Sequence, residues 1–138
     1  MRVAKKLTGM SGSFILDTNI VIALFGNDAS VVREIEKATD ILLPAIVAGE
    51  LYYGAFNSAK PEQNRLKIDE FLKEVTVLNC DKETGKFYGS IKKELKDKGK
   101  PIPENDIWII ALAMQHKLKV VSRDIHFENV DNLDLVKW

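Results

Sequence analysis

The alternation of short apolar segments with longer amphipathic ones most restricts what this chain can fold into. The short segments have the length and β-branched or apolar character of strands, and between them apolar residues recur every three or four positions, as on one face of a helix. Such alternation is typical of a parallel sheet covered by helices on both faces. The expected strands cover residues 13–16, 41–43, 75–78, 118–122 and 133–137. The sequence therefore predicts a three-layer α/β/α sandwich with a central parallel sheet of four to five strands.

The segments between these strands have the apolar spacing of helices. We expect helices over residues 20–25, 31–38, 44–56, 60–73, 82–98 and 107–114. Pro44 is expected to open the third of them, because proline fits the first turn of a helix. Gly99, with Pro101 just beyond, is expected to end the fifth. Residues 17–19 are expected to form a polar turn before the first helix.

The length of 138 residues is typical of one domain with a single hydrophobic core. We expect residues 13–138 to form that domain and residues 1–12 to be a flexible basic tail without a functional role. No apolar stretch reaches the roughly 18 residues that a membrane-spanning helix needs, so no membrane association is expected. Cys80 is the only cysteine, which excludes an intrachain disulfide and a cysteine-rich zinc site. We expect its thiol to be buried and the protein to be cytoplasmic.

Four acidic residues stand out because of their places relative to the expected strands and helices. Asp17 follows the first strand, Asp124 lies just past the fourth, and Asp106 lies near the start of a helix. In an open parallel sheet, ligands bind at the carboxyl ends of the strands, where loops and helix N-termini meet. Glu50 lies one or two helical turns further along. The sequence predicts that all four carboxylates converge at this edge of the sheet.

Glu50 is the most informative of the four, because it is the only charged residue between Asp40 and Lys60. Its helical neighbours three and four positions away are apolar, aromatic or glycine, so no polar stripe carries it toward water. An unpaired carboxylate in such surroundings is costly. It is therefore paired, protonated or bound to a cation, and the simplest alternative is a lone glutamate exposed on an otherwise buried helix.

Ordinary structural roles are open for the other three acids. Asp106 would interact well with a helix dipole, Asp17 would cap the helix that follows it, and Asp124 would be a turn residue. Clustered carboxylates without a cation raise one another's pKa values, whereas Mg²⁺ and Mn²⁺ prefer oxygen ligands. The set of four at one edge favours a site for one or two such ions, which would activate water for phosphodiester hydrolysis.

The residues around these acids resemble the PIN-domain nucleases, and their arrangement looks most like the VapC-type toxins of prokaryotic toxin–antitoxin pairs. The matching stretches are residues 14–19, 49–54, 102–106 with 110–111, and 122–127. Each stretch alone is a weak signal. All four in this order, spread over nearly the whole of residues 13–138, form a fairly specific one.

The resemblance implies a Mg²⁺- or Mn²⁺-dependent endoribonuclease with an RNA substrate, a cognate antitoxin that fills the groove at the site, and a homodimer. The catalytic and metal-site residues that it implies are Asp17, Glu50, Asp106 and Asp124, supported by the polar side chains of Asn19 and Ser122. Ser122 is a mild departure, because many relatives have threonine there, but it keeps the hydroxyl group.

The charge balance permits a polyanionic substrate. Basic and acidic residues number 20 each, so a cation held by four acids would leave 16 negative charges against 20 positive ones. Arg123 and Lys100 are candidates for phosphate contacts, although a solvated helix face explains the lysines of residues 92–100 equally well. His116 and His126 would act as general bases only if they reach the acids, and the sequence favours structural roles for both.

Other functions share part of this evidence. A housekeeping RNA-processing or DNA-structure nuclease would have the same acids, and a non-catalytic RNA-binding module would keep the fold without needing them. A receiver-like domain phosphorylated on Asp17 fits less well, because that pattern needs an adjacent acidic pair and Asp17 has no acidic neighbour. The intact acids favour the nuclease toxin and leave open its RNA target and whether it binds one ion or two.

Overall fold

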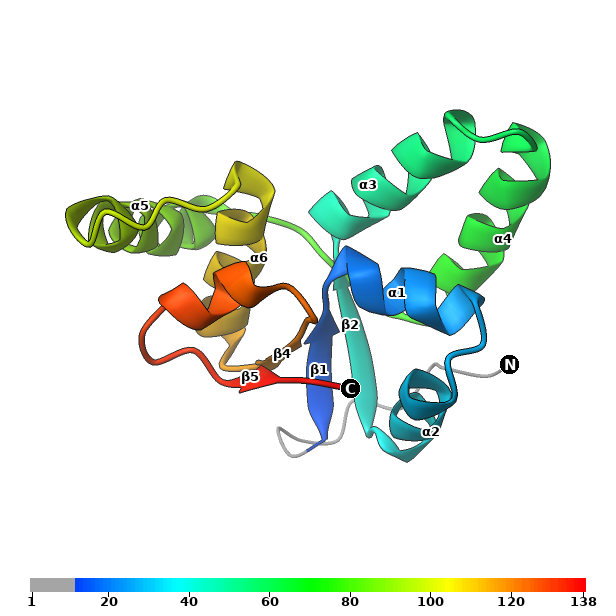
Figure 1. Ribbon diagram of the computed structural model, residues 1–138, viewed down its shortest axis with the longest axis horizontal. Coiled ribbons are helices and arrows are strands. Elements are labelled where there is room, and N and C mark those ends of the chain that lie inside the picture. Colours follow the sequence, from blue (N-terminus) through cyan, green and yellow to red (C-terminus); the bar gives the residue numbers. More distant parts are fainter. Residues whose placement is uncertain (1–11) are drawn as a thin grey trace.

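A five-stranded, fully parallel sheet forms the centre of the computed structural model, which describes residues 12–138 (Figure 1). The predicted fold class is confirmed. The strands are β1 (Ser13–Leu16), β2 (Asp40–Pro44), β3 (Thr76–Leu78), β4 (Lys119–Val121) and β5 (Leu135–Val136). Residues 1–11 of the expected tail lie outside the described residues. Gly12 is described, and its carbonyl accepts backbone hydrogen bonds from Thr39 and Asp40.

The α-helices occupy the places that the apolar spacing predicts, with shifted ends, and the structure adds a short 3₁₀ helix that was not predicted. They are α1 (Thr18–Phe25), α2 (Ala29–Lys37), α3 (Ala45–Phe56), α4 (Pro61–Lys73), α5 (Lys82–Asp97), α6 (Glu104–His116) and the 3₁₀ helix η1 (Ile125–Asn129). The expected polar turn over residues 17–19 is wrong, because α1 begins at Thr18 with Asp17 as its N-cap. Pro44 does not open α3 but ends β2 and stands at the N-cap position.

The strand order β3-β2-β1-β4-β5 places a topological switch between β1 and β4. The chain moves outward from β1 through β2 to β3, and then returns to pair β4 with the other side of β1. Because crossovers between parallel strands are right-handed, this reversal sends the later helices to the opposite face of the sheet. Accordingly, α1 to α4 lie on one side in Figure 1 and α5 and α6 on the other. A crevice at the carboxyl ends of β1 and β4 is the usual ligand site in such folds.

The hydrophobic core fills both sides of the central strands. Ile15, Leu43 and Val120 are fully buried within the sheet, and α6 contributes a continuous buried run from Ile109 to Ala113. A strand covered on both faces carries apolar side chains in both directions, which explains the lack of strict alternation in β2 and β4. None of the helices in this part of the chain is long and apolar enough to cross a membrane. Cys80, expected to be buried, is exposed after the edge strand β3.

Candidate active site

Asp17 is the most deeply buried acid at the carboxyl edge of the sheet. It follows β1 directly, and its backbone N–H continues the ladder to β4 by donating to the carbonyl of Val121 over 3.0 Å. Its Oδ1 accepts from the backbone N–H of Thr18 at 2.8 Å, and its Oδ2 accepts from the hydroxyl of Ser122 at 2.7 Å. Burial raises the pKa of Asp17, and the charge of Asp124 raises it further, although both hydrogen bonds oppose the shift.

Asn19 and Ser122 hold the ends of β1 and β4 together around Asp17. The amide nitrogen of Asn19 donates to Asp17 Oδ2 at 3.3 Å, while its amide oxygen accepts from the backbone N–H of Arg123 at 3.3 Å. The hydroxyl oxygen of Ser122, fully buried, also accepts from the backbone N–H of Asp124 at 3.0 Å. Both expected supporting residues therefore lie beside Asp17.

Asp106 reaches the same edge because α6 runs back toward the start of β4, so that its N-terminal turn lies at the carboxyl ends of the strands. Its side chain is 13% exposed. Burial raises the pKa of Asp106 to about 6, with additional contributions from the charges of Asp17, Asp124 and Glu50, while His126 opposes the shift. Since the charge of each of the other three acids raises the pKa of Asp106, the structure brings the four carboxylates together.

Glu50 lies in the second turn of α3, which begins immediately after β2. It is half-buried and not isolated in solvent, because its Oε1 accepts a hydrogen bond from the hydroxyl of Thr18 at 3.0 Å. Burial raises the pKa of Glu50, and the charge of Asp17 adds to the shift. Thr18 was not predicted as a site residue, although its place directly after Asp17 at the start of α1 was a usable signal.

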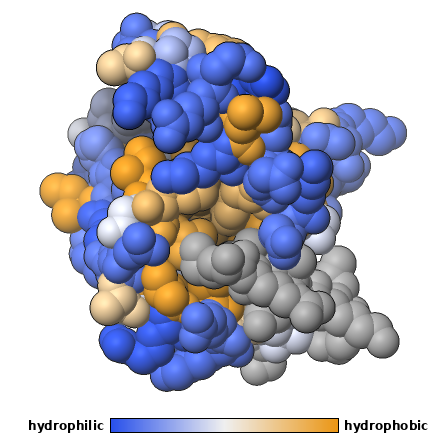
Figure 2. All heavy atoms as spheres, turned by 90° about the vertical axis from the view of Figure 1, so that its right-hand side faces the viewer, coloured by the Kyte–Doolittle hydropathy of each residue, from blue (hydrophilic) through white to orange (hydrophobic). Residues whose placement is uncertain are grey.

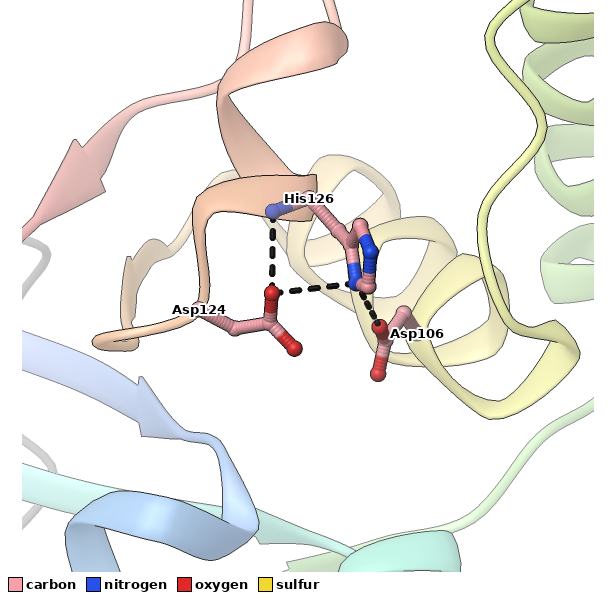
Figure 3. A group of neighbouring side chains, drawn as sticks. All are labelled: Asp106, Asp124 and His126. Carbon is pink, nitrogen blue, oxygen red and sulfur yellow. Dashed lines mark hydrogen bonds and ion pairs between the residues drawn. The ribbon is translucent and has the colours of Figure 1, made fainter.

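Asp124 and His126 form the part of the site that follows β4 (Figure 3). Asp124 is the N-cap of η1, and its Oδ1 accepts from the backbone N–H of His126 at 2.9 Å. The imidazole of His126 folds back, so that Nδ1 lies 3.0 Å from Asp124 Oδ1 and 3.8 Å from Asp106 Oδ2. His126 therefore reaches the acids, which is the condition that the sequence set for a chemical role, although it favoured a structural one. His116 is at the opposite, exposed end of α6.

The two basic residues predicted to contact phosphate have other surroundings. The guanidinium of Arg123 lies 3.0 Å from Asp28 Oδ2 and donates from Nε to the carbonyl of Trp138 at 2.9 Å. Lys100 is exposed in the loop before α6. Phosphate binding by either residue stays a prediction.

The donor set fits a hard divalent cation. None of the ion pairs described within residues 12–138 joins a lysine or an arginine to Asp17, Glu50, Asp106 or Asp124, and in this part of the chain only the imidazole of His126 pairs with two of these acids. In the described part of the chain, Asp106, Asp124 and His126 offer ligand atoms that all lie within 4.8 Å of one another. A divalent cation would relieve the repulsion that raises the pKa of Asp106.

Comparisons with known proteins agree with this architecture. The model of the PIN domain family matches residues 14–133. The chain is 38% identical over 128 residues to ribonuclease VapC2 of Haemophilus influenzae, covering 91% of this chain and 97% of that protein. It is 32% identical over 128 residues to the tRNA(fMet)-specific endonuclease VapC of Shigella flexneri, with the same two coverages. Among solved structures, VapBC2 from Rickettsia felis, bound to a DNA fragment from its promoter, superimposes with a TM-score of 0.85 and 32% identity, covering 91% of this chain and 98% of that one.

Proposed function

Because the chain belongs to the PIN domain family, we propose that it is a divalent-metal-dependent endoribonuclease that acts as the toxin of a toxin–antitoxin pair. The observation that carries the proposal is the group of four carboxylates at the switch point of the sheet, which no lysine or arginine in residues 12–138 neutralises. The names of the relatives, ribonucleases and a tRNA-specific endonuclease, support RNA as the substrate.

The proposed mechanism assigns different tasks to the four acids. Asp17, Asp106 and Asp124 would hold Mg²⁺ or Mn²⁺, which when bound lowers the pKa of a coordinated water and stabilises negative charge on the phosphodiester. Ser122 and Asn19 fix the orientation of the Asp17 carboxylate. Glu50, whose pKa is raised and whose Oε1 is held by Thr18, would orient the attacking water and accept its proton.

An antitoxin partner would occupy the apolar groove next to the acids. This groove, of about 300 Å³, lies between α1, α3 and α4 and is lined by Ile22, Phe25, Glu50, Leu51, Gly54, Ala55, Asn64, Lys67 and Ile68. Figure 2 looks onto this side of the molecule and shows apolar side chains gathered in a hollow with polar side chains around it. Ile22 is 60% exposed, and Glu50 belongs to both the groove and the acidic site. A segment seated here would cover the entrance to the site, and the VapBC complexes among the solved structures are consistent with such a partner.

We also propose that residues 13–138 act as one nuclease domain, that the protein forms a homodimer, and that it acts on RNA in the cytoplasm. Exposed aromatic and aliphatic side chains on α3 and α4, namely Tyr53, Phe56 and Leu66, provide apolar surface for self-association. Light scattering coupled to size-exclusion chromatography would measure the mass in solution, and a mass of one chain at micromolar concentration would contradict the dimer.

The proposed nuclease activity is tested by replacing single acids with their amides. Asp17→Asn and Asp106→Asn are each expected to lower Mg²⁺-dependent cleavage of a structured RNA by at least about 100-fold, because a ligand to the cation is lost. Asp97→Asn, an exposed acid on α5 outside the site, is the matched control and should leave cleavage unchanged. Circular dichroism would show that all three variants are folded. Full activity in both active-site variants would contradict the proposal.

The toxin role is tested separately by controlled expression in a bacterial host. The wild-type chain should arrest growth and the Asp17→Asn variant should not, because arrest depends on cleavage. A housekeeping nuclease would cleave RNA in vitro without causing arrest, and a non-catalytic binding module would do neither.

A further inference from the structure

The proposed mechanism gives no role to Nδ1 of His126, a nitrogen atom at the acidic site. Nδ1 of His126 is buried and makes no hydrogen bond, although the ring as a whole is 45% exposed. Its distances of 3.0 Å from Asp124 Oδ1 and 3.8 Å from Asp106 Oδ2 are ion-pair contacts only when the ring is protonated, and Asp124 Oδ1 also accepts the backbone N–H of His126. Figure 3 shows the buried nitrogen facing both acids, and in a neutral ring with its proton on Nε2 this nitrogen would present a free lone pair to them.

The separation of the donor atoms suits a shared ion. Two atoms that each lie about 2.1 Å from one cation, at right angles or tetrahedrally, are about 3.0–3.4 Å apart. Nδ1 of His126 lies 3.0 Å from an oxygen of Asp124 and 3.8 Å from one of Asp106, and all three residues offer ligand atoms within 4.8 Å of one another. Small side-chain rotations would bring one oxygen of each carboxylate and Nδ1 around the same point.

We propose that His126 is a nitrogen ligand, through Nδ1, of the divalent cation held by Asp106 and Asp124, and that it shifts the preference of the site from Mg²⁺ toward Mn²⁺ and other transition-metal ions. The inference rests on the proposed metal-dependent function. Carboxylates and water serve Mg²⁺ and Mn²⁺ alike, but an imidazole nitrogen stabilises transition-metal ions more than it stabilises Mg²⁺. The backbone of η1 fixes the ring, because Asp124 caps this helix and Phe127 beside His126 is fully buried.

The composition of the chain makes a spectroscopic test unusually direct. His126 and His116 are its only histidines, and His116 lies at the exposed far end of α6. Pulsed electron paramagnetic resonance of the Mn²⁺-loaded protein should therefore show ¹⁴N coupling from one imidazole. The coupling should disappear in His126→Phe, which keeps a ring without a donor, and in His126→Asn, whose amide oxygen can replace Nδ1 as a hard ligand. It should persist in His116→Phe, the matched control.

Titration calorimetry gives a second readout that does not depend on catalysis. His126→Phe should weaken Mn²⁺ binding by at least about tenfold, whereas His126→Asn should retain Mg²⁺ binding and lower the ratio of Mn²⁺ to Mg²⁺ affinity. Melting temperatures measured without metal would show whether each variant is folded.

The possible results separate this inference from the proposed function. Loss of the ¹⁴N coupling and of the Mn²⁺ preference in both His126 variants supports the nitrogen ligand. If wild-type protein binds Mn²⁺ in a manner that Asp106→Asn abolishes, but shows no imidazole coupling and no effect of His126→Phe, the ligand role is wrong and the metal site stands. If wild-type protein shows no saturable Mn²⁺ binding, both proposals are overturned.

Discussion

The carboxyl group of Asp106 shows how clustering of acids changes the pKa of a single residue. Its ordinary pKa is 3.8, and burial together with three neighbouring acids raises it to about 6. Between about pH 4 and pH 6, the Asp106 carboxyl is therefore largely protonated in the folded, metal-free protein but ionised in the unfolded chain. The contribution of this group to stability is fully present below about pH 4 and is lost as the pH rises through 6.

Asp106→Asn should consequently stabilise the metal-free protein at pH 7.5. A shift of about two pKa units corresponds at most to about 3 kcal/mol, and relaxation and solvent screening reduce the expected gain to about 1–2 kcal/mol, or several degrees in melting temperature. Thermal unfolding in the presence of a chelator would measure it. The gain should vanish at pH 3.5, where the wild-type carboxyl is protonated, and an equal gain at both values would contradict this explanation.

Thr18 is expected to position Glu50 during cleavage. Thr18→Val keeps the shape of the side chain but removes the hydroxyl that donates to Oε1 over 3.0 Å, so Glu50 loses its orienting partner. We expect kcat for RNA cleavage to fall by about tenfold, which corresponds to roughly 1.4 kcal/mol and lies near the lower limit of what a hydrogen bond to a charged group contributes. Thr18→Ser retains the hydroxyl and should retain most of the activity. Equal loss in both variants would indicate a packing role.

At the scale of elements, η1 places two site residues by means of one buried side chain. This helix is only five residues long and follows the cap at Asp124, so its own hydrogen bonds do little to stabilise it. Phe127, fully buried in the core, anchors it to the sheet. The orientation of Asp124 and His126 therefore depends on the apolar packing of Phe127, which is next to His126 and three residues after Asp124.

Phe127→Ala should lower both the stability of the protein and its affinity for metal. Loss of the buried ring is expected to lower the free energy of unfolding by about 3–5 kcal/mol and to weaken Mn²⁺ binding, because η1 is no longer fixed. Urea unfolding and titration calorimetry would measure the two effects. Phe127→Leu should lose far less of both, and unchanged Mn²⁺ affinity in a folded Phe127→Ala variant would show that η1 is positioned by other contacts.

At the scale of the whole molecule, the site joins segments from both halves of the chain. Asp17 and Glu50 come from the first half, with α1 and α3, and Asp106 and Asp124 come from the second half, beyond the return of the chain to β4. The groove lined by α1, α3 and α4 adjoins this junction through Glu50. A partner bound in the groove would therefore affect the site without contacting the second half of the sheet.

Ile22→Asp should weaken antitoxin binding without reducing cleavage. The substitution places a charge in the apolar groove, and we expect affinity to fall by at least about tenfold while activity of the free protein persists. Val77→Asp is the matched control, since Val77 is exposed at 37% on the edge strand β3 and does not line the groove. Calorimetry with the partner encoded beside this chain would compare them. Equal binding by wild-type protein and Ile22→Asp would place the partner elsewhere.

Local patterns were sufficient to predict the layers of the fold and the acids of the candidate site. Apolar periodicity reports which face of a segment is buried, so it predicted the alternating strands and helices. An isolated charge such as Glu50 is costly in an apolar helix, so its presence indicated a special environment. The ends of the elements were less predictable. The cap by Asp17, a local bond to Thr18, was among the roles that the sequence allowed, whereas the place of Pro44 at the end of β2 depends on its pairing with Leu78 of β3.

The strand order and the place of His126 were decided only by the tertiary structure. Pairing of β4 with the open side of β1 results from how the whole chain packs, and no local periodicity encodes which strands become neighbours. The direction of the His126 ring depends on the anchoring of Phe127 and on Asp106, which is 20 positions earlier in the sequence. The sequence alone determined which residues carry charge and which are apolar, and long-range packing determined how far apart the charged groups lie.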